Sequence, residues 1–283
     1  MAATTQDQAG RVWLITGTST GFGRALAEAV LARGGRVVAT AREVSTVKDL
    51  AERAPRRVLP ARLDVTDPAS VRQAVDAAIA EFNQIDVVVN NAGHGLIGAL
   101  EELSLEQARA VLETNLFGVL TVTRAVLPHM RARRQGHFVQ MSSVGGVVGN
   151  PGHAIYATSK FALEGMSEAL AGEVAPFGIR VLIVEPGPFR TEFAGRSMTF
   201  ADPIPDYAET PAGALRARFR AQDGRQPNDP ARAAAIIIDM VSADRAPLRV
   251  PLGPEAVRRI REKLQRQLAE LDQWESTLVD TRY

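Results

Sequence analysis

The sequence predicts a doubly wound α/β fold, in which helices form a layer on each face of a central parallel sheet. Short apolar runs alternate with longer stretches of helical period along most of the chain. Most of these runs are rich in Val and Ile and apolar throughout, which is typical of strands buried on both faces. A glycine-rich turn joins the first run to the first helical stretch. The 283 residues can bury one sizeable core, so we expect a single domain over 1–283.

The predicted strands are short and bounded by Gly, Asn or Pro. They cover residues 12–15, 37–39, 58–63, 85–89, 137–141 and 181–184. The predicted helices lie between them, near 22–33, 68–83, 104–131 and 155–175. Asp67 followed by Pro68 marks the start of one helix, because a capping residue precedes proline at the first helical position.

The organisation of the chain changes after Thr191. Residues 192–228 are rich in Pro, Gly, Arg and Asp and have weak periodicity, apart from a short helix near 211–221, so we expect a substrate-binding insertion there. The C-terminal part, 229–283, should contain a helix at 229–243, a strand at 248–250 and a final helix at about 255–275. Apolar residues recur in the final helix at steps of three and four, which predicts either packing on the body or an oligomer contact. They are Val257, Ile260, Leu264, Leu268, Leu271, Trp274 and Leu278.

The composition argues against several classes of protein. With 33 basic and 32 acidic residues, the chain lacks the positive excess of a general nucleic-acid binder. The absence of Cys excludes disulfides and thiolate chemistry, and the four His show no metal spacing, so we expect no metal site and structural or surface His. Residues 1–10 resemble a flexible tail rather than a signal peptide, and we see no stretch approaching the roughly 18–20 apolar residues of a bilayer span. We therefore expect a cytoplasmic protein.

The segment TGTSTGFG at 16–23 follows the first predicted strand and opens the first helix. Gly17, Gly21 and Gly23 permit a tight turn and let backbone N–H groups approach a pyrophosphate at the positive end of the helix. The strand–turn–helix context supports nucleotide binding of the Rossmann type over a purely structural turn.

The end of the second strand bears on cofactor choice. Where NAD-binding domains place an acid that binds the ribose 2′-OH, this chain has Ala41 followed by Arg42. A guanidinium in place of the acid suits a 2′-phosphate, which favours NADP(H) over NAD(H). The alternative is that Arg42 is a solvated surface residue.

Tyr156 and Lys160 are spaced i, i+4 on a predicted helix and therefore share one face. Because the chain has only three Tyr and three Lys, chance would produce such a pair in roughly 3% of cases. Ser143 follows the strand at 137–141, thirteen positions before Tyr156.

With these motifs, the sequence resembles the short-chain dehydrogenase/reductase family, in its single-domain branch, over roughly residues 10–195. The hydroxysteroid and retinol dehydrogenase-like members are the most similar. The motifs occur in the family's order and include the turn at 16–23, Asp64 in LDV, NNAG at 90–93, Asn115, Ser143, Tyr156-x-x-x-Lys160 and Pro186-Gly187-x-x-x-Thr191.

The resemblance implies roles for four catalytic residues. Tyr156 would exchange its phenolic proton with the substrate oxygen as hydride passes to or from the nicotinamide. Lys160, together with the positive ring of the oxidised cofactor, would lower the pKa of Tyr156, and Lys160 would also bind the nicotinamide ribose. Ser143 would donate a hydrogen bond to the substrate oxygen, and Asn115 would hold a water that links Lys160 to solvent.

The resemblance also implies a set of cofactor-binding residues. Asp64 would read the adenine edge, 91–93 would pack along the adenosine, and Thr191 would bind the carboxamide. Thr20 replaces the basic residue that NADP-binding members often carry there, so the 2′-phosphate would rely on Arg42. The full set is Gly17, Ser19, Thr20, Gly21, Phe22, Gly23, Arg42, Asp64, Val65, Asn91, Ala92, Gly93, Tyr156, Lys160, Pro186, Gly187 and Thr191.

Together these features predict an NADP(H)-dependent oxidoreductase that interconverts an alcohol and a ketone or aldehyde on a fairly apolar substrate. A pocket with walls from 144–153, 188–193 and 192–228 should hold the substrate. The alternative is a non-catalytic NADP(H)-binding sensor, which would need the glycine turn but not the Ser, Tyr and Lys. Epimerising or dehydrating relatives usually carry a larger C-terminal domain. Family members commonly form dimers or tetramers through the long helices near 104–131 and 155–175, so we expect a homodimer or homotetramer.

Overall fold

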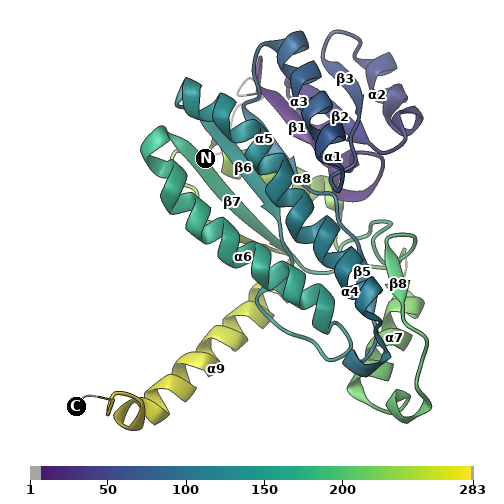
Figure 1. Ribbon diagram of the computed structural model, residues 1–283, viewed down its shortest axis with the longest axis vertical. Coiled ribbons are helices and arrows are strands. Elements are labelled where there is room, and N and C mark those ends of the chain that lie inside the picture. Colours follow the sequence, from purple (N-terminus) through teal and green to yellow (C-terminus); the bar gives the residue numbers. More distant parts are fainter. Residues whose placement is uncertain (1–7, 223, 282–283) are drawn as a thin grey trace.

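A computed structural model describes residues 8–222 and 224–281 and shows one seven-stranded sheet in which every neighbouring pair is parallel (Figure 1). The chain enters at a central strand and winds outward in both directions, which confirms the doubly wound α/β prediction. In order across the sheet, the strands are β3 Val58–Arg62, β2 Arg36–Ala41, β1 Val12–Ile15, β4 Val87–Asn90, β6 Gly136–Met141, β7 Ile179–Pro186 and β9 Arg249–Leu252. Each has its ends within two residues of the prediction.

Helices cover both faces of the sheet and make three layers (Figure 1). Alternate residues of β1 supply the two cores: Trp13 and Ile15 face one, and Leu14 the other. Side chains of α1 Gly21–Ala32, α2 Lys48–Arg53 and α8 Pro230–Ser242 fill the first core. Side chains of α3 Pro68–Phe82, α5 Gly118–Arg133 and α6 Ala154–Val174 fill the second.

The capping prediction for α3 is confirmed. The Asp67 carboxylate accepts a hydrogen bond from the backbone N–H of Ala69 at 2.9 Å, and Pro68 occupies the first helical position. Asp229 and Pro230 start α8 in the same way, with a bond of 2.8 Å to the N–H of Ala231.

The region expected to be one helix at 104–131 is interrupted. It consists of α4 Leu105–Leu112, a π-helical turn at Glu113–Phe117, and α5. The turn carries Asn115, whose side chain is fully buried, and such turns often mark functional sites.

The same stretch, Leu105–Arg133, has the length and composition of a membrane span, with a mean hydropathy of 1.4 over its most apolar window. The expectation that no stretch comes near such a span is therefore wrong by this measure. Core helices of soluble proteins share this composition, and Val119, Val122 and Val126 of α5 are buried in this fold. One face of the stretch is thus occupied by the body of the protein.

The insertion contains more regular structure than its sequence pattern indicates. The predicted helix is present as α7 Pro211–Gln222. In addition, β8 Met198–Phe200 pairs in parallel with β5 Gly95–Ile97 to form a second, two-stranded sheet. Tight 3₁₀ turns occur at Val44–Val47, Leu100–Glu102, Val144–Gly146, Ala175–Phe177 and Pro205–Tyr207.

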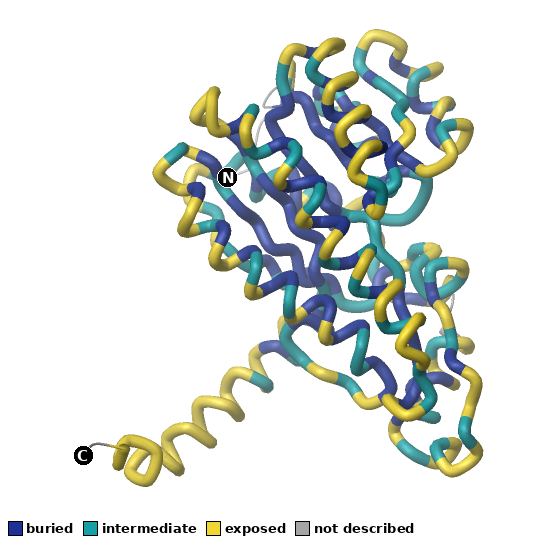
Figure 2. The backbone as a smooth tube through the Cα atoms, in the orientation of Figure 1, coloured by how far each residue is buried: buried dark blue, intermediate teal, exposed yellow. Residues whose placement is uncertain are grey.

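The two ends of the chain differ from expectation. Residues 1–7 of the predicted flexible tail lie outside the described part, but Gln8 is buried, donates to Ser242 and accepts from the indole N–H of Trp13, so the tail prediction is wrong there. The final helix, α9 Pro254–Leu278, packs on the body only near its start, at Ala256 and Ile260. It then projects away with its side chains exposed, so body packing is wrong for most of its length (Figures 1 and 2).

Candidate active site

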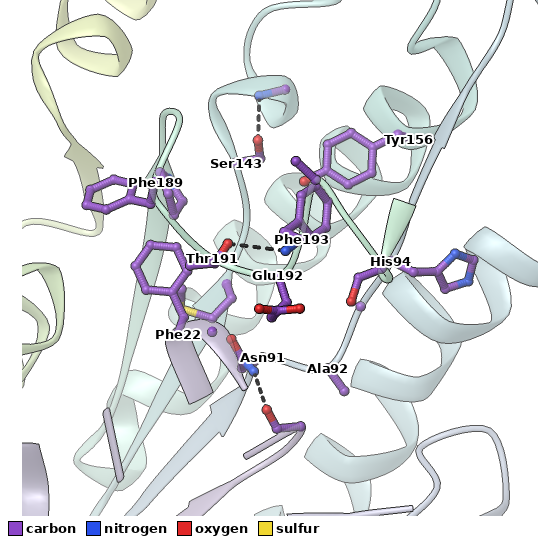
Figure 3. A pocket seen from close by; sticks show the side chains of 18 of the residues that line it. Phe22, Asn91, Ala92, His94, Ser143, Tyr156, Phe189, Thr191, Glu192 and Phe193 are labelled. Atoms are coloured by element: carbon purple, nitrogen blue, oxygen red, sulfur yellow. Dashed lines mark hydrogen bonds between the residues drawn. The ribbon is translucent and has the colours of Figure 1, made fainter. Parts of the chain in front are cut away.

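A cavity of about 780 Å³ opens at the carboxyl ends of the central strands, where a doubly wound sheet places its ligands. Its walls include the loops that follow β1, β4, β6 and β7 and parts of the insertion. Residues from 144–153, 188–193 and 192–228 are among them, as the sequence predicted for the substrate pocket. Figure 3 shows side chains from these loops facing one another across the cavity.

The glycine turn forms the floor where α1 begins. Gly17 and Gly21 adopt positive φ angles of 68° and 59°, which side chains rarely tolerate. A Cβ on Gly23 would lie 2.3 Å from the carbonyl oxygen of Gly17, so only glycine fits. The Asn91 amide donates to the carbonyl oxygens of Thr16 and Gly17 at 2.9 and 3.1 Å and fixes the turn from β4 (Figure 3). This leaves backbone N–H groups at the start of α1 for a phosphate.

Arg42 and Asp64 lie on the cavity at the ends of neighbouring strands. Burial raises the pKa of Asp64, but hydrogen bonds from Thr66 and the charges of Arg42 and Arg62 outweigh it and lower that pKa overall. Asp64 is therefore an ionised acceptor, and Arg42 is an exposed cation beside it. The pair lies where the adenosine part of a dinucleotide cofactor would bind.

Ser143, Tyr156 and Lys160 meet at the centre of the cavity. Ser143 and Tyr156 both flank Gly145, since a Cβ added there would lie 3.2 Å from Tyr156 Cε1 and 3.4 Å from Ser143 Oγ. Ser143 Oγ accepts the N–H of Gly145 at 3.0 Å, which leaves its hydroxyl proton available to the cavity. Lys160 Nζ donates to the Met141 carbonyl at 2.7 Å and lies 5.9 Å from the centre of the Tyr156 ring.

Burial controls the proton affinities of these groups. It raises the pKa of Tyr156 to about 12, against a hydrogen bond with Ser143 that lowers it. It lowers the pKa of Lys160 to about 8, although the charge of Glu164 acts the other way. Without a cofactor, the groups of the chain therefore raise the pKa of Tyr156. The lowering expected from Lys160 together with the positive ring of the oxidised cofactor stays a prediction.

Asn115 lies behind the cavity wall rather than on it. Its amide donates to Ser159 Oγ at 3.1 Å and to the His94 carbonyl at 2.9 Å, and its Oδ1 accepts the N–H of His94 at 3.0 Å. A Cβ on Gly93 would contact both Asn115 Oδ1, at 3.0 Å, and Lys160 Nζ, at 3.8 Å. The π-helical turn thus brings the carboxamide close to the lysine.

The substrate side is lined by rings that the sequence did not single out as a group. His153 and Phe193 lie against Tyr156, with ring centres 4.9 and 5.6 Å away, and Phe219 of α7 lies 5.1 Å from His153. Burial, followed by the charges of Arg218 and Arg259, lowers the pKa of His153 to about 4, so the imidazole is neutral. The sequence predicted a structural or surface role for this histidine, although its segment 144–153 was expected to form part of the pocket wall; the structure places it on that wall beside Tyr156.

The structure brings almost all predicted site residues to this one cavity. Gly23 and Asn115 support it from behind. In the part of the chain that the structure describes, no group of His, Asp or Glu has an arrangement that could hold a metal ion. The residues on the cavity are Gly17, Ser19, Thr20, Gly21, Phe22, Arg42, Asp64, Val65, Asn91, Ala92, Gly93, Ser143, Tyr156, Lys160, Pro186, Gly187 and Thr191.

Comparison with known proteins identifies the family. The sequence profile of the short chain dehydrogenases matches residues 11–200. The chain belongs to the short-chain dehydrogenase/reductase family. Oxidoreductase BOA17 of Botryotinia fuckeliana is 41% identical over 87% of this chain and 90% of its own length, and bovine retinol dehydrogenase 8 is 39% identical over 84% and 80%. A short-chain dehydrogenase from Streptomyces avermitilis is 43% identical, with a TM-score of 0.90 over 96% of this chain and 98% of that one.

This short-chain dehydrogenase is therefore an NAD(P)-dependent oxidoreductase. A 3-ketoacyl-(acyl-carrier-protein) reductase from Brucella melitensis, 25% identical with a TM-score of 0.74 over 87% of this chain and 97% of its own, was solved with NADH. Independently of these relatives, the cavity fits a nicotinamide cofactor, because the glycine turn, Asp64 and Lys160 all line one continuous space.

Proposed function

We propose that the chain is an NADP(H)-dependent enzyme that interconverts an alcohol and a ketone or aldehyde on an apolar substrate. The observation that carries this proposal is the meeting of Ser143, Tyr156 and Lys160 at the point where the cofactor cradle opens into the ring-lined part of the cavity. The cofactor supplies or accepts the hydride.

The residues of the chain handle the proton and the developing charge. Ser143 donates a hydrogen bond to the substrate oxygen and holds it beside the Tyr156 hydroxyl. Tyr156 gives its proton to that oxygen in reduction and removes it in oxidation. Lys160 binds the nicotinamide ribose and, with Asn115 behind it, returns a proton to Tyr156 from solvent.

The NADP preference rests on the surroundings of Arg42. This cation is exposed at the end of β2 and faces the cavity, while Ala41 leaves the preceding position without an acid. A 2′-phosphate would pair with the guanidinium, whereas the 2′-OH of NAD would find no carboxylate at this position.

An apolar substrate is supported by the walls around Tyr156. Phe193, Phe219 and Val144 line the cavity there, and His153 presents a neutral ring. The similarity to a retinol dehydrogenase agrees with a long apolar alcohol or aldehyde.

Homo-oligomer formation through the long helices is supported by exposed apolar side chains. Leu105, Phe117 and Leu120 on α4, the π-helical turn and α5 are 68%, 49% and 36% exposed, and Phe161 on the neighbouring α6 is 45% exposed. A second copy covering these side chains would match the helix-mediated dimers or tetramers expected from the family.

Substitution of Tyr156 by Phe tests the reaction. We expect kcat with a panel of apolar ketones and aldehydes to fall by several hundredfold or more, within the roughly 10²–10⁴-fold range of acid–base catalysis, while NADPH affinity stays within a few-fold. The Tyr207→Phe variant is the control, because Tyr207 is a half-buried residue whose hydroxyl donates to Glu101, away from the cavity. Turnover that survives in Tyr156→Phe would remove Tyr156 from this role, and tight NADPH binding by the wild type without any turnover would favour the sensor.

Substitution of Arg42 by Ala tests the cofactor preference. The ratio of kcat/KM for NADPH to that for NADH should fall by about tenfold to a hundredfold, as expected for a lost charge-assisted hydrogen bond. Arg62→Ala is the matched control, since Arg62 is also exposed near Asp64 but does not line the cavity. A wild type that prefers NADH would contradict the assignment.

A further inference from the structure

The outer part of α9 has no contact with the body of the protein. Ala256 and Ile260 are buried near its start against Val144, but every described residue from Leu264 to Thr281 is exposed. Figures 1 and 2 show this part as a helical arm projecting away from the sheet. Helices gain most of their stability from packing an amphipathic face, so a free arm of this length requires a partner surface.

A stripe of large apolar side chains runs along the arm. Leu264, Leu271 and Leu278 recur every seventh residue, and Leu268 and Trp274 lie on the same side. All five are between 55% and 59% exposed. Val257, which is 38% exposed, lies on the same side nearer the body, whereas Ile260 is buried against the body. The continuous exposed stripe therefore runs from Leu264 to Leu278. This heptad spacing is typical of helices that pair with another helix.

The charges of α9 indicate the direction of pairing. Residues 258–266 contain five basic residues and one acidic residue, whereas residues 267–280 contain four acidic residues and no basic residue. The two halves of the helix therefore carry opposite net charge, and a second copy running in the opposite direction would bring each basic half beside an acidic half.

We propose that α9 pairs with α9 of a second copy of this chain in an antiparallel two-helix contact. The heptad spacing of the exposed residues sets the register: Leu264 lies opposite Trp274 of the partner subunit, Gln267 opposite Leu271 of the partner subunit, and Leu268 near its own symmetry mate. This register also places Arg261 beside Glu275 of the partner subunit twice, once on each side of the two-fold axis. A parallel pair would instead place Glu270 beside Glu275 of the partner subunit and align the basic halves.

The same charges argue against a lipid surface as the occupant. An amphipathic helix that lies on an anionic membrane carries basic residues along its polar face. In α9 the outer half, which holds Trp274 and Leu278, carries only acidic residues among its charged side chains. The acidic outer half would be repelled by such a surface.

Cysteine cross-linking tests the pairing directly, because the chain has no Cys of its own. In the antiparallel register Gln267 faces Leu271 of the partner subunit. We expect Gln267→Cys and Leu271→Cys proteins to form little disulfide-linked dimer separately, but to form it rapidly when they are mixed in the presence of oxidised glutathione. Gln265→Cys, on the far side of the helix, is the control and should not cross-link with either. Disulfides within each single variant would indicate a parallel pair, and no cross-linking in the mixture would overturn the proposal.

A charge exchange provides the second test and does not remove apolar contacts. Arg261→Glu and Glu275→Arg should each weaken self-association by about tenfold or more, and the double variant should return to within a few-fold of the wild type. Analytical ultracentrifugation measures the change, and contacts through α4, α5 and α6 are common to all variants. Both positions lie outside the cavity, so turnover per chain should stay constant. A double variant as weak as the singles would contradict the register, and flotation with phosphatidylserine vesicles that is lost in Leu264→Glu, without cross-linking, would overturn self-pairing in favour of a membrane.

Discussion

Glu185 should make this protein lose stability as the pH rises toward neutrality. The side chain lies near the end of β7 and is 1% exposed, and neither carboxyl oxygen has a hydrogen-bond partner among the described residues. Arg249 Nε is 3.7 Å away but bonds Glu164 at 3.0 Å, so two buried acids share one cation. Burial first, then the charge of Glu164, raises the pKa of Glu185 to about 7 against the opposing charge of Arg249.

The size of this loss of stability follows from the pKa values of Glu185 in the unfolded and folded states. Between the ordinary Glu value of 4.5 and the folded value of about 7, the folded state keeps a proton that the unfolded state has released. The stabilising contribution is therefore fully present below pH 4.5 and is lost as the pH rises through about 7. At about 1.4 kcal/mol per pH unit over roughly 2.5 units, the loss is on the order of 3 kcal/mol.

Glu185→Gln removes this titration and leaves a side chain of nearly the same size. Urea unfolding of the variant and the wild type at pH 5, 6, 7 and 8, followed by circular dichroism, gives the difference in unfolding free energy at each pH. We expect this difference to move by about 2.5 kcal/mol in favour of the variant between pH 5 and 8, because part of the loss already occurs below pH 5. Any effect of the amide on the unfolding free energy that does not depend on pH cancels, because only the change of this difference with pH is compared.

Glu168→Gln is the matched control for Glu185→Gln. Glu168 bonds the same Arg249, but its side chain is 62% exposed. Its free-energy difference from the wild type should stay within about 0.5–1 kcal/mol and change little with pH. A Glu185→Gln difference that stays flat from pH 5 to 8 would refute the reasoning, and so would one that grows toward low pH.

Two further substitutions test the supports of the site. Glu102→Gln should cost about 3–5 kcal/mol in urea unfolding, because its fully buried carboxylate pairs with Arg216 and accepts the N–H groups of Ala99 and Ile204 at 2.6 and 2.9 Å. The exposed Glu101→Gln should lie within about 1 kcal/mol of the wild type. Gly23→Ala should weaken NADPH binding in a fluorescence titration by about tenfold or more, since its Cβ would lie 2.3 Å from the Gly17 oxygen. Gly172→Ala, with open space around it on α6, should bind NADPH normally; equal binding by both variants would contradict the role of the turn.

The sheet could be predicted from the sequence because its strands are buried on both faces. A run such as 181–184 is apolar throughout, and in the fold β7 lies between two neighbours with helices above and below. The β5–β8 pair could not be predicted in this way. Each strand has three residues, and about a hundred residues separate Gly95 from its partner Met198, so no local periodicity records the contact. Short pairs of this kind are set by tertiary packing.

The cofactor side of the site was more predictable than the substrate side for a related reason. Gly17 and Gly23 have their residue types dictated by local backbone geometry: Gly17 has a positive φ, and a Cβ on Gly23 would meet the Gly17 carbonyl oxygen in the same turn. Phe219 meets His153 beside Tyr156 only because α7 folds back over the cavity. The sequence placed the segments 144–153 and 192–228 on the pocket wall, but no local pattern indicates which of their side chains meet.

The surroundings of Lys160 explain why this position has a lysine rather than an arginine. The chain has 33 basic residues but only three Lys, and one of them lies where the site is driest, at 6% exposure. Its ammonium meets one protein acceptor, the carbonyl oxygen of Met141. An arginine would bring five N–H donors into the same space and leave most of them unpaired, a cost of about 1–3 kcal/mol for each buried group. It would also stay charged, whereas burial lowers the pKa of Lys160 to about 8, within reach of a proton exchange with Tyr156 and solvent. The position therefore requires a compact group that can titrate, which explains why a chain otherwise built with arginine has lysine here.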